Sequence, residues 1–382
     1  MQMRIRAAFM RGGTSKGLVF RASDLPVDPA ERDRALLRAM GSPDPYGRQL
    51  DGMGGGISSL SKICIVGPAS RNDADVDYTF GQVGIGDAVV DYAGNCGNMS
   101  SAIGPFAVEE GLVATPPDGE ATVRIHNTNT GKVIVSRFQV RGGQPVVDGN
   151  FALDGVGGTA APIRLEFLEP GGAKTGKLLP TGQALDTVDV PELGPVEVSL
   201  VDAANPMVFV AAQALECTGA ELPDEIAANA TLMQRLETIR AAASVMMGLT
   251  PDLAAARALT SIPKVSMLAP PMAAPLISGN RLTADEADIT TRTISVGQPH
   301  RAIPLTSALC LAAAMRIPGS LAAQMASGHG NAHLRIGHPS GTISVDAVVE
   351  SSQPSIHVRH ATVLRTARRL FDGHVCVPVE PA

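Results

Sequence analysis

The apolar residues of the chain follow two patterns, one typical of strands and one typical of helices. Short β-branched stretches that follow polar turns, such as residues 17–25, predict strands. Residues 29–40 and 223–249 carry apolar positions at helical spacing and predict helices. Residues 99–111 and 306–316 are apolar almost all round. A helix of that kind is expected to be buried inside its own sheet rather than to lie on a surface.

The same order of segments occurs twice along the chain. Five segments of the first half resemble five of the second, at offsets between 190 and 211 residues, and one match pairs Lys62 with Lys264. Ordered matches of this kind indicate duplication. We predict two similar α+β domains, residues 1–188 and 189–382, and leave open that the last strand returns to the first domain. The matching segments are 17–25 with 207–215, 61–69 with 263–271, 76–80 with 287–291, 100–113 with 306–319 and 123–135 with 334–345.

Composition limits the class of protein. The chain has 382 residues, of which 45% are hydrophobic and 18% charged, as in a soluble globular protein, and no apolar run is long enough to span a bilayer. The N-terminus lacks a secretory h-region. Five cysteines without a CxxC pair favour a reducing compartment, so we expect a cytoplasmic protein. Net charge is −6 and aromatic content 3%, which argues against nucleic-acid binding.

Cys96 lies in the segment YAGNCGNMSS, directly before the first predicted buried helix. A helix N-terminus favours the thiolate form of cysteine, and its N–H groups can bind an anion. Gly94 and Gly97 let backbone amides approach a ligand closely. Packing in a turn is the other interpretation. We favour a functional thiol, with Asn95, Gly97 and Asn98 as ligand donors, and expect the remaining cysteines to pack.

Lys62 follows a glycine-rich loop and precedes the predicted strand ICIV. The amides of Gly55 and Gly56 and the hydroxyl of Ser59 can surround an anion. A lysine at the end of a buried strand can lose its charge by desolvation and act as a general base, whereas a solvated lysine is the commoner case. The residues alone support these two interpretations of Lys62 about equally.

The segment RGGTSKG formally contains the G-x-S-x-G pattern of serine hydrolases. That pattern requires a strand, the serine and then a helix, but Ser15 precedes a strand and lies near the N-terminus. The order of lysine and hydroxyl residues is also wrong for a P-loop. We expect Thr14, Ser15 and Lys16 to present donors to a carboxylate.

Polar turns precede both predicted buried helices. They place N–H groups and the positive helix end beside residues 95–99 and 305–307. We expect two such helix ends to form an anion-binding cleft between the domains. The candidate ligands from the second half are Lys264, His300, Thr306 and Ser307.

Motifs for metals and cofactors are weak. The segment HGNAH (329–333) has two histidines four residues apart but no nearby acidic third ligand, so no metal site is predicted. The segment GIGDAV (84–89) lacks the third glycine and the following helix of a dinucleotide fingerprint. We therefore expect no metal and no cofactor.

Eight motifs carry a resemblance to a known family: MRGGTSKG, DGMGGGISSLSK, DYAGNCGN, GPFAVEEG, RIHNTNTGK, NPMVFV, PKVSMLAPP and RIGHPSG. Together they resemble the 2-methylaconitate cis–trans isomerase family, which also contains 3-methylitaconate Δ-isomerase and 4-oxalomesaconate tautomerase. The resemblance extends from about Arg4 to Val377. It implies a diaminopimelate-epimerase-like fold, in which each of two similar domains has a central helix wrapped by a β-sheet. Lys62 and Cys96 fall on the family's catalytic lysine and cysteine. Epimerases of this fold use one cysteine from each domain, but the second half offers PLTSA, so a two-thiol racemase is disfavoured.

The resemblance also implies a reaction, the cofactor-free isomerisation of an unsaturated di- or tricarboxylate. Lys62 is the preferred base, and Cys96 is the opposing acid or a guide for the intermediate. Residues 74–98 look most like the methylitaconate and methylaconitate branches, with aconitate as a further candidate substrate and 4-oxalomesaconate tautomerisation as the alternative. A hydrolase with Ser15 or Cys96 as nucleophile, and a non-catalytic carboxylate-binding protein, are less favoured. A homodimer is one candidate assembly.

Overall fold

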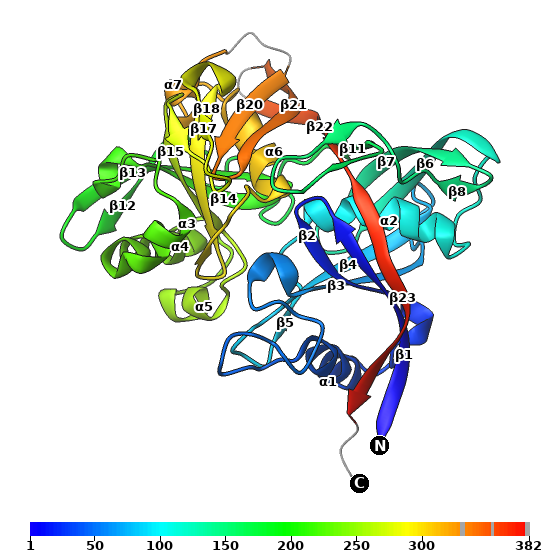
Figure 1. Ribbon diagram of the computed structural model, residues 1–382. Helices are drawn as coiled ribbons and strands as arrows, with labels where there is room; N and C mark the ends of the chain where they lie inside the picture. The colour runs from blue at the N-terminus through cyan, green and yellow to red at the C-terminus, as the bar shows by residue number, and fades with distance from the viewer. Residues whose placement is uncertain (329–332, 353–354, 379–382) are drawn as a thin grey trace. The chain divides into compact units, whose positions relative to one another are not determined.

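The chain forms two compact units in a computed structural model (Figure 1). The first unit contains residues 1–165 together with the C-terminal segment that begins at Leu364. The second unit contains Glu166–Val363. The structure describes residues 1–328, 333–352 and 355–378.

The chain passes from one unit to the other inside two strands, β11 (Ile163–Leu168) and β22 (Ser355–Arg365). The sequence placed the division after residue 188 instead. Neither strand is interrupted by a linker rich in glycine or proline where the units change over. Composition therefore does not mark the changeover.

The first unit is built on a mixed sheet in which β23 pairs antiparallel with β1, β1 with β2, β3 with β4, and β6 with β7. The pairs β2–β3 and β4–β6 are parallel. The C-terminal strand thus lies beside the N-terminal one. The strands are β1 (Gln2–Gly12), β2 (Ser15–Arg21), β3 (Lys62–Pro68), β4 (Val76–Val83), β5 (Val90–Asp91), β6 (Asp118–Asn127), β7 (Lys132–Arg141), β8 (Gln144–Pro145), β9 (Phe151–Ala152), β10 (Thr159–Ala160) and β23 (Ala367–Pro378).

Two helices cover opposite faces of this sheet. Helix α1 (Pro29–Met40) begins where the Asp28 side chain accepts a hydrogen bond from the Glu31 amide, and it ends at Gly41, whose φ of 74° is readily adopted by glycine. It packs on Leu18, Phe20 and Ile63. Helix α2 (Gly97–Glu109) is buried from residue 97 to 108 and contacts β1, β2, β3, β6, β7 and β23. The predicted central helix wrapped by a sheet is confirmed.

The second unit repeats this pattern. Strand β13 pairs antiparallel with β12 and β14, β15 with β18, and β20 with β21, while β14–β15 and β18–β20 are parallel. Helix α6 (Leu305–Ala314) is buried along its whole length and contacts β13, β14 and β21. The other strands and helices are β12 (Asp186–Val190), β13 (Gly194–Ala203), β14 (Asn205–Ala211), β15 (Lys264–Ala269), β16 (Ala274–Pro275), β17 (Arg281–Leu282), β18 (Ile289–Ser295), β19 (Gln298–Pro299), β20 (His333–His338), β21 (Gly341–Ser352), α3 (Pro223–Ala228), α4 (Ala230–Met246), α5 (Leu253–Ala258) and α7 (Leu321–Met325).

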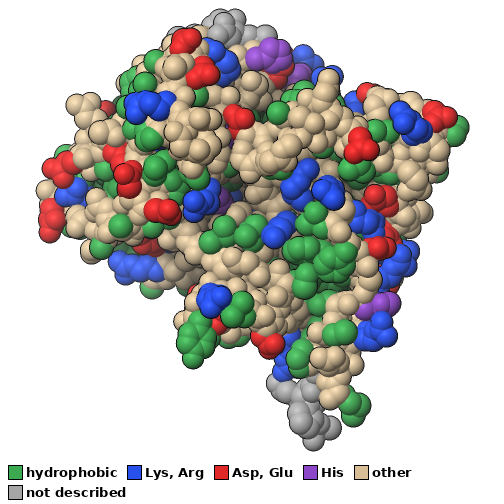
Figure 2. All heavy atoms as spheres, viewed as in Figure 1, with side chains coloured by type: hydrophobic (Ala, Val, Ile, Leu, Met, Phe, Trp, Pro, Cys, Tyr) green, Lys and Arg blue, Asp and Glu red, His purple; other side chains and the backbone are tan. Residues whose placement is uncertain are grey.

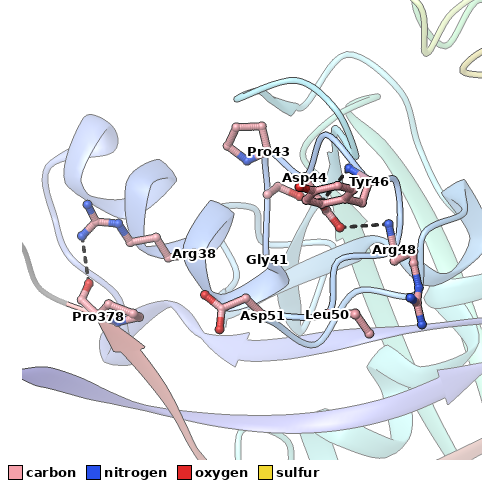
Figure 3. A pocket seen from close by; sticks show the side chains of 10 residues that line it. Arg38, Gly41, Pro43, Asp44, Tyr46, Arg48, Leu50, Asp51 and Pro378 are labelled. Carbon is pink, nitrogen blue, oxygen red and sulfur yellow. Dashed lines mark hydrogen bonds between the residues drawn. The ribbon is translucent and has the colours of Figure 1, made fainter.

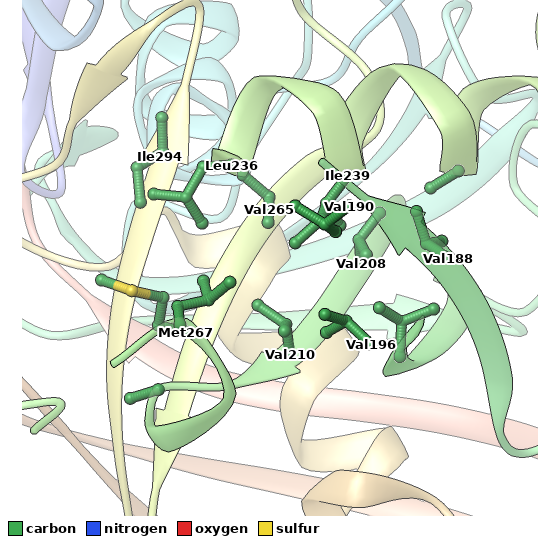
Figure 4. Close-up of a cluster of buried hydrophobic side chains, with 14 of the residues drawn as sticks. Val188, Val190, Val196, Val208, Val210, Leu236, Ile239, Val265, Met267 and Ile294 are labelled. Atoms are coloured by element: carbon green, nitrogen blue, oxygen red, sulfur yellow. The ribbon is translucent and has the colours of Figure 1, made fainter. Parts of the chain in front are cut away.

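The core of the second unit lies between α4 and its sheet. Figure 4 shows Leu236 and Ile239 of the helix facing Val208 and Val265, which come from the adjacent strands β14 and β15. Burial of apolar side chains on both sides of this contact stabilises the unit, at about 25 cal/mol per Å² of apolar surface.

Strand registers locate the duplication residue by residue. Val19 pairs with Cys64 in β2–β3, and Phe209 pairs with Ser266 in β14–β15, so the predicted match of Lys62 with Lys264 is confirmed. The match of Val76 with Ala287 is wrong by two residues. Val76 pairs with Ile125 in β4–β6, and Ile289 pairs with Ile336 in β18–β20, so Ile289 is the residue equivalent to Val76. A shift of two leaves the alternation of inward and outward side chains unchanged, so the apolar pattern does not detect it.

The long helix predicted over residues 223–249 is broken in the structure. It divides into α3 and α4 at Asn229, whose side chain accepts a hydrogen bond from the Leu232 amide and starts a second helix. Asparagine competes in this way with the helical backbone, which explains the break. Among the described residues, no helix has both the length and the apolar character needed to cross a membrane.

Candidate active site

Lys62 is the first residue of β3, and the strand's alternation directs its side chain toward α2. Ile63 belongs to the cluster packed on α1, so Lys62 and Cys64 point to the opposite face. The Lys62 side chain is nearly buried, with 6% of the residue exposed. Its Nζ atom donates a hydrogen bond to Oε1 of Gln82, the residue directly opposite on β4, at 2.9 Å.

The Gln82 side chain is fixed in the orientation that presents its oxygen to Lys62. Its Nε2 atom donates to the carbonyl oxygens of Ser58 at 3.1 Å and Ser61 at 2.8 Å. Because both amide hydrogens are used, the amide oxygen faces the amine. Gln82 therefore positions Lys62 through an uncharged hydrogen-bond acceptor.

Lys62 lies near an aromatic ring and, among the described residues, has no carboxylate partner. The Nζ atom lies 4.9 Å from the centre of the Phe80 ring. Among the residues that the structure describes, no aspartate or glutamate is within ion-pair distance of it. A lysine without a carboxylate partner can give and take a proton without first breaking an ion pair.

The glycine-rich loop before Lys62 is held by a buried glutamine. Gln49 donates to Ser61 Oγ at 2.7 Å and accepts from the Gly56 amide at 3.0 Å. The Gly54 amide donates to the Met40 carbonyl at 3.2 Å. These two amides are thus used within the protein. The predicted binding of substrate at Gly55, Gly56 and Ser59 stays a prediction, with the Gly55 amide and the Ser59 hydroxyl as its better-placed donors.

Cys96 is the N-cap residue of α2, as the sequence suggested. No side chain caps this helix, and its first turn contains no acidic residue. The side chains of Asn95 and Asn98 are also buried, and Asn95 Oδ1 has no hydrogen-bond partner among the described residues. A buried helix end without a cap is expected to bind a ligand, since its N–H groups otherwise lack partners.

Cys64 and Tyr78 lie between Lys62 and the start of α2. Besides burial, the neighbouring Cys96 raises the pKa of the Cys64 thiol and Lys62 lowers it. Tyr78 Oη donates to the Cys96 carbonyl at 3.4 Å, and Cys64 Sγ lies 3.8 Å from that hydroxyl. Burial raises the pKa of Cys64, and burial followed by the neighbouring thiols raises the pKa of Tyr78. Both groups therefore stay neutral at physiological pH and form a rigid wall.

The turn between β1 and β2 lies against the first turn of α2. A Cβ atom on Gly13 would meet Asn98 Oδ1 at 2.4 Å, and the residue has a φ of 51°, so only glycine fits this position. Asn98 Nδ2 donates to Thr14 Oγ1 at 3.0 Å. Ser15 is buried at the start of β2, and Lys16 Nζ lies 5.6 Å from the Phe9 ring centre. The turn and Asn98 thus lie together, and their binding of substrate stays a prediction.

Four predicted ligands lie in the second unit. Lys264 is the first residue of β15 and is buried, and Thr306 and Ser307 lie in the first turn of α6. Ser307 Oγ is without a hydrogen-bond partner in the described part of the chain. His300 is half-buried after β19, and its amide donates to the Thr293 carbonyl. Their part in substrate binding stays a prediction.

Sequence reasoning missed Gln82 and Arg365. Gln82 is recognisable only from the β3–β4 register, because nothing in the local sequence links it to Lys62. Arg365 lies 267 residues from Asn98, yet its Nε atom donates to Asn98 Oδ1 at 3.3 Å. The local sequence, LRTARR, gives no signal that separates Arg365 from Arg368 and Arg369.

In the described part of the chain, no group of three or more His, Cys, Asp or Glu residues could hold a metal ion. Residues 329–332 of the HGNAH segment lie outside the described residues.

A large open pocket lies on the outer side of the loop after α1 and contains none of the predicted ligands. Its volume is about 880 Å³. Figure 3 shows Asp44 at its wall, where the carboxylate accepts hydrogen bonds from the Tyr46 and Arg48 amides. Tyr46 and Leu50 are largely exposed. The chemistry described above is concentrated elsewhere, at the start of α2.

Comparison with known proteins identifies the family of this chain. The model of the PrpF protein family matches residues 2–378. Similar curated proteins are a 3-methylitaconate isomerase of Eubacterium barkeri, 42% identical over 98% of both chains, and a 2-methyl-aconitate isomerase of Shewanella oneidensis, 40% identical over 99% of this chain and 98% of that one. An (4E)-oxalomesaconate Delta-isomerase of Novosphingobium sp. is 41% identical over 97% of this chain and 96% of that one.

Solved structures agree with the fold. A methylitaconate-delta-isomerase aligns with a TM-score of 0.78 at 41% identity, covering 98% of this chain and 96% of that one. A hydroxyproline epimerase from Agrobacterium vitis aligns with a TM-score of 0.57 at 13% identity, covering 98% and 94%, and shares the fold alone. The predicted epimerase-like fold is confirmed, and the chain belongs to the PrpF protein family.

Proposed function

We propose that this isomerase moves a proton and a C=C bond in an unsaturated di- or tricarboxylate, with 2-methylaconitate, 3-methylitaconate or aconitate as candidate substrates. The observation that carries the proposal is the buried amine of Lys62, which donates a hydrogen bond to the neutral amide of Gln82. Lys62 lies on the face of β3 that packs on α2, a helix whose N-terminus has no side-chain cap. The relatives named as methylaconitate and methylitaconate isomerases support this class of substrate.

In the proposed reaction, Lys62 as a neutral amine removes a proton from a carbon that is α or vinylogous to a carboxylate. The electrons of the C–H bond enter a dienolate. A proton then returns to the same or the other end of that system, which moves the double bond or, after rotation, changes cis to trans. Gln82 accepts a hydrogen bond from Lys62 and keeps the amine directed at one position.

The dienolate needs stabilisation of its developing negative charge. The N–H groups at the start of α2, whose first turn holds no carboxylate, supply fixed dipoles for it. One such donor contributes roughly 3 kcal/mol in comparable oxyanion sites. Cys96, at the N-cap, is the proposed acid that returns the proton or the group that guides the intermediate.

The test is incubation of the purified protein in D₂O with aconitate, 2-methylaconitate, 3-methylitaconate and 4-oxalomesaconate, followed by NMR. We expect deuterium at an allylic carbon and a shifted or inverted double bond in aconitate, 2-methylaconitate or 3-methylitaconate. Binding of these acids without any exchange would instead indicate a non-catalytic carboxylate-binding protein. Covalent labelling of Ser15 or Cys96 by an acylating substrate, without exchange, would indicate a hydrolase.

Tautomerisation of 4-oxalomesaconate is the second candidate, favoured by the 41% identity to the oxalomesaconate Delta-isomerase. The same four-acid experiment separates it from the first. The two reactions share the proton transfer and differ in the group next to the reacting carbon, and one methylene in a pocket discriminates by only about 1–3 kcal/mol.

Further parts of the proposal concern the setting of the protein. Its five cysteines are free thiols, which suits a reducing compartment, and we propose a cytoplasmic location. We also propose that it binds no nucleic acid and acts as a homodimer, which sedimentation analysis would test.

A further inference from the structure

Arg365, at the end of β22, is a buried cation without a counter-ion in the described part of the chain. Only 3% of the residue is exposed. Its Nε atom donates to Asn98 Oδ1 at 3.3 Å and Nη1 donates to the Leu364 carbonyl at 3.0 Å. No carboxylate of the described residues pairs with it, and burial alone lowers its pKa, to about 9. The guanidinium therefore still carries its charge at neutral pH.

Other arginines with largely buried side chains have carboxylates nearby. In Arg292, burial lowers the pKa to about 10 and the nearby carboxylates of Glu221 and Glu225 act against that shift. Arg240 contacts both carboxylate oxygens of Glu237, at 2.7 and 2.6 Å. Arg369, four residues after Arg365, pairs with Glu109 at 2.7 Å and with Glu110 at 3.0 Å. Since an unpaired buried charge is costly, the exception at Arg365 calls for an anion that the protein itself does not supply.

The position of Arg365 places it at the uncapped start of α2. A Cβ atom on Gly13 would lie 3.2 Å from Arg365 Cδ and 2.4 Å from Asn98 Oδ1, so the arginine, the turn and Asn98 are in close contact. Asn98 is the second residue of α2. The remaining guanidinium atom, Nη2, makes no hydrogen bond to the described residues. It stands beside helix N–H groups that also attract negative charge.

The surrounding surface is positively charged as well. Arg11 and Arg368 are directly opposite each other in the β1–β23 pair, and Lys16 follows on β2. In Figure 2, blue Lys and Arg side chains gather over the region that β1, β2 and β23 occupy in Figure 1. An acidic ligand would be attracted to this part of the first unit.

We propose that Arg365 binds one carboxylate of the substrate, together with the N-terminus of α2, and so sets which carbon faces Lys62. This inference rests on the proposed function for the identity of the ligand. The guanidinium presents planar N–H donors that match a carboxylate, whereas a lysine at the same place would be a point charge. Arg365 is thus a substrate-positioning residue, distinct from the amine and the thiol.

The test uses propane-1,2,3-tricarboxylate, a saturated acid that the isomerisation cannot convert. Calorimetry and thermal unfolding are compared for wild type, R365Q, R365K and R368Q. R368Q is the matched control, because it removes the same charge from an exposed arginine three residues away. We expect R365Q to raise the Kd by about 10- to 100-fold, R365K to recover part of the affinity, and R368Q to change it less than about threefold.

Thermal unfolding separates this role from a structural one. Without ligand, R365Q should unfold at or above the wild-type temperature, because it removes an uncompensated buried charge. The tricarboxylate should stabilise wild type but not R365Q. A lower unfolding temperature for R365Q with unchanged ligand stabilisation would show that Arg365 only supports the fold. If R365Q does not fold, an affinity of R365K equal to that of wild type would overturn the proposal.

The outcome is independent of turnover. If wild type isomerises an acid but binds the tricarboxylate equally well with and without Arg365, the assignment of Arg365 fails and the proposed function stands. If wild type exchanges no proton with any of the four acids but shows Arg365-dependent binding, the proposed function fails and the carboxylate site stands.

Discussion

The two units of the chain share a strand order and a buried helix but differ in what lies at the start of that helix. Lys62 and Lys264 occupy corresponding positions, each the first residue of a strand and each buried. The β3–β4 register places Gln82 opposite the first lysine, whereas the β15–β18 register begins one residue after the second, with Val265 opposite Ile294. In the first unit, the neutral amide of Gln82 accepts a hydrogen bond from the amine of Lys62.

The N-termini of the two buried helices, α2 and α6, also differ between the units. The N-cap of α2 is Cys96, whereas the N-cap of α6 is Pro304, which has neither a thiol nor a backbone N–H. Hydroxyl residues follow in the second unit, at Thr306 and Ser307. We predict that, of these two similar units, the first holds the groups that transfer the proton. The expected division of labour is chemistry in the first unit and ligand binding in the second.

The largest effect is expected from Lys62→Ala. Loss of the base should lower kcat by about 10⁴-fold, the upper end of what general base catalysis contributes. Lys264→Ala is the matched control and should act mainly on KM. Steady-state kinetics checks both variants, with circular dichroism as a test of folding. Equal losses of kcat in the two variants would remove the asymmetry between the units.

The next effect is expected from Cys96→Ala, compared with Cys310→Ala in α6. Cys96 at the helix start should matter for proton return, so kcat should fall by about 10- to 10³-fold. Cys310 is fully buried, with its thiol donating to the Val201 carbonyl at 3.4 Å. Its loss should cost about 1 kcal/mol of stability and leave kcat unchanged. A Cys310 variant as slow as the Cys96 variant would contradict the assignment.

A smaller effect is expected from Gln82→Met, which keeps the volume but removes the acceptor for Lys62. We expect kcat to fall about 10-fold with KM nearly constant, because Gln82 acts on the base and not on the substrate. The carbonyls of Ser58 and Ser61 lose their donor, which should cost about 1–3 kcal/mol of stability. Thr79→Val, on the opposite face of β4, is the control. A change confined to KM would mean that Gln82 touches the substrate.

The smallest effect is expected from Tyr78→Phe and concerns alkaline pH. Burial raises the pKa of Tyr78 in the folded state, whereas the unfolded chain loses the phenol proton near its ordinary value of 10.0. The folded state then binds more protons, so the free energy of unfolding is unaffected by this group below pH 10 and falls as pH rises above it. The loss is about 1.4 kcal/mol per pH unit.

Tyr78→Phe should lack that fall, and its stability should approach that of wild type as the pH rises. Chemical denaturation at several alkaline pH values measures the difference. Parallel curves for the two proteins would show that the phenol titrates normally.

Local patterns were sufficient for much of the fold. The all-round apolarity of the two central helices, the start of α1 at Pro29 and the ordered repeat depend on neighbouring residues or on residue order. The break at Asn229 and the two-residue slip at Val76 were missed, because side-chain capping and strand register are decided by three-dimensional contacts.

The site was predictable where glycine and helix-start signals are local, as at Cys96, Asn98 and the Gly13 turn. Gln82 and Arg365 were not, since each meets its partner only through strand pairing or through the return of the C-terminal segment to the first unit. Residues of this kind carry no sequence pattern of their own. Their proposed roles follow from the burial of their side chains and from which of their N–H donors already bind other protein groups.

The most direct test of the central claim is a single-turnover experiment with Lys62→Ala in D₂O, using whichever acid wild type converts. Wild type should incorporate deuterium at the allylic carbon at the rate of isomerisation, and Lys62→Ala should bind the acid with similar affinity and incorporate none. Deuterium incorporation by Lys62→Ala at a rate near that of wild type would show that another group removes the proton.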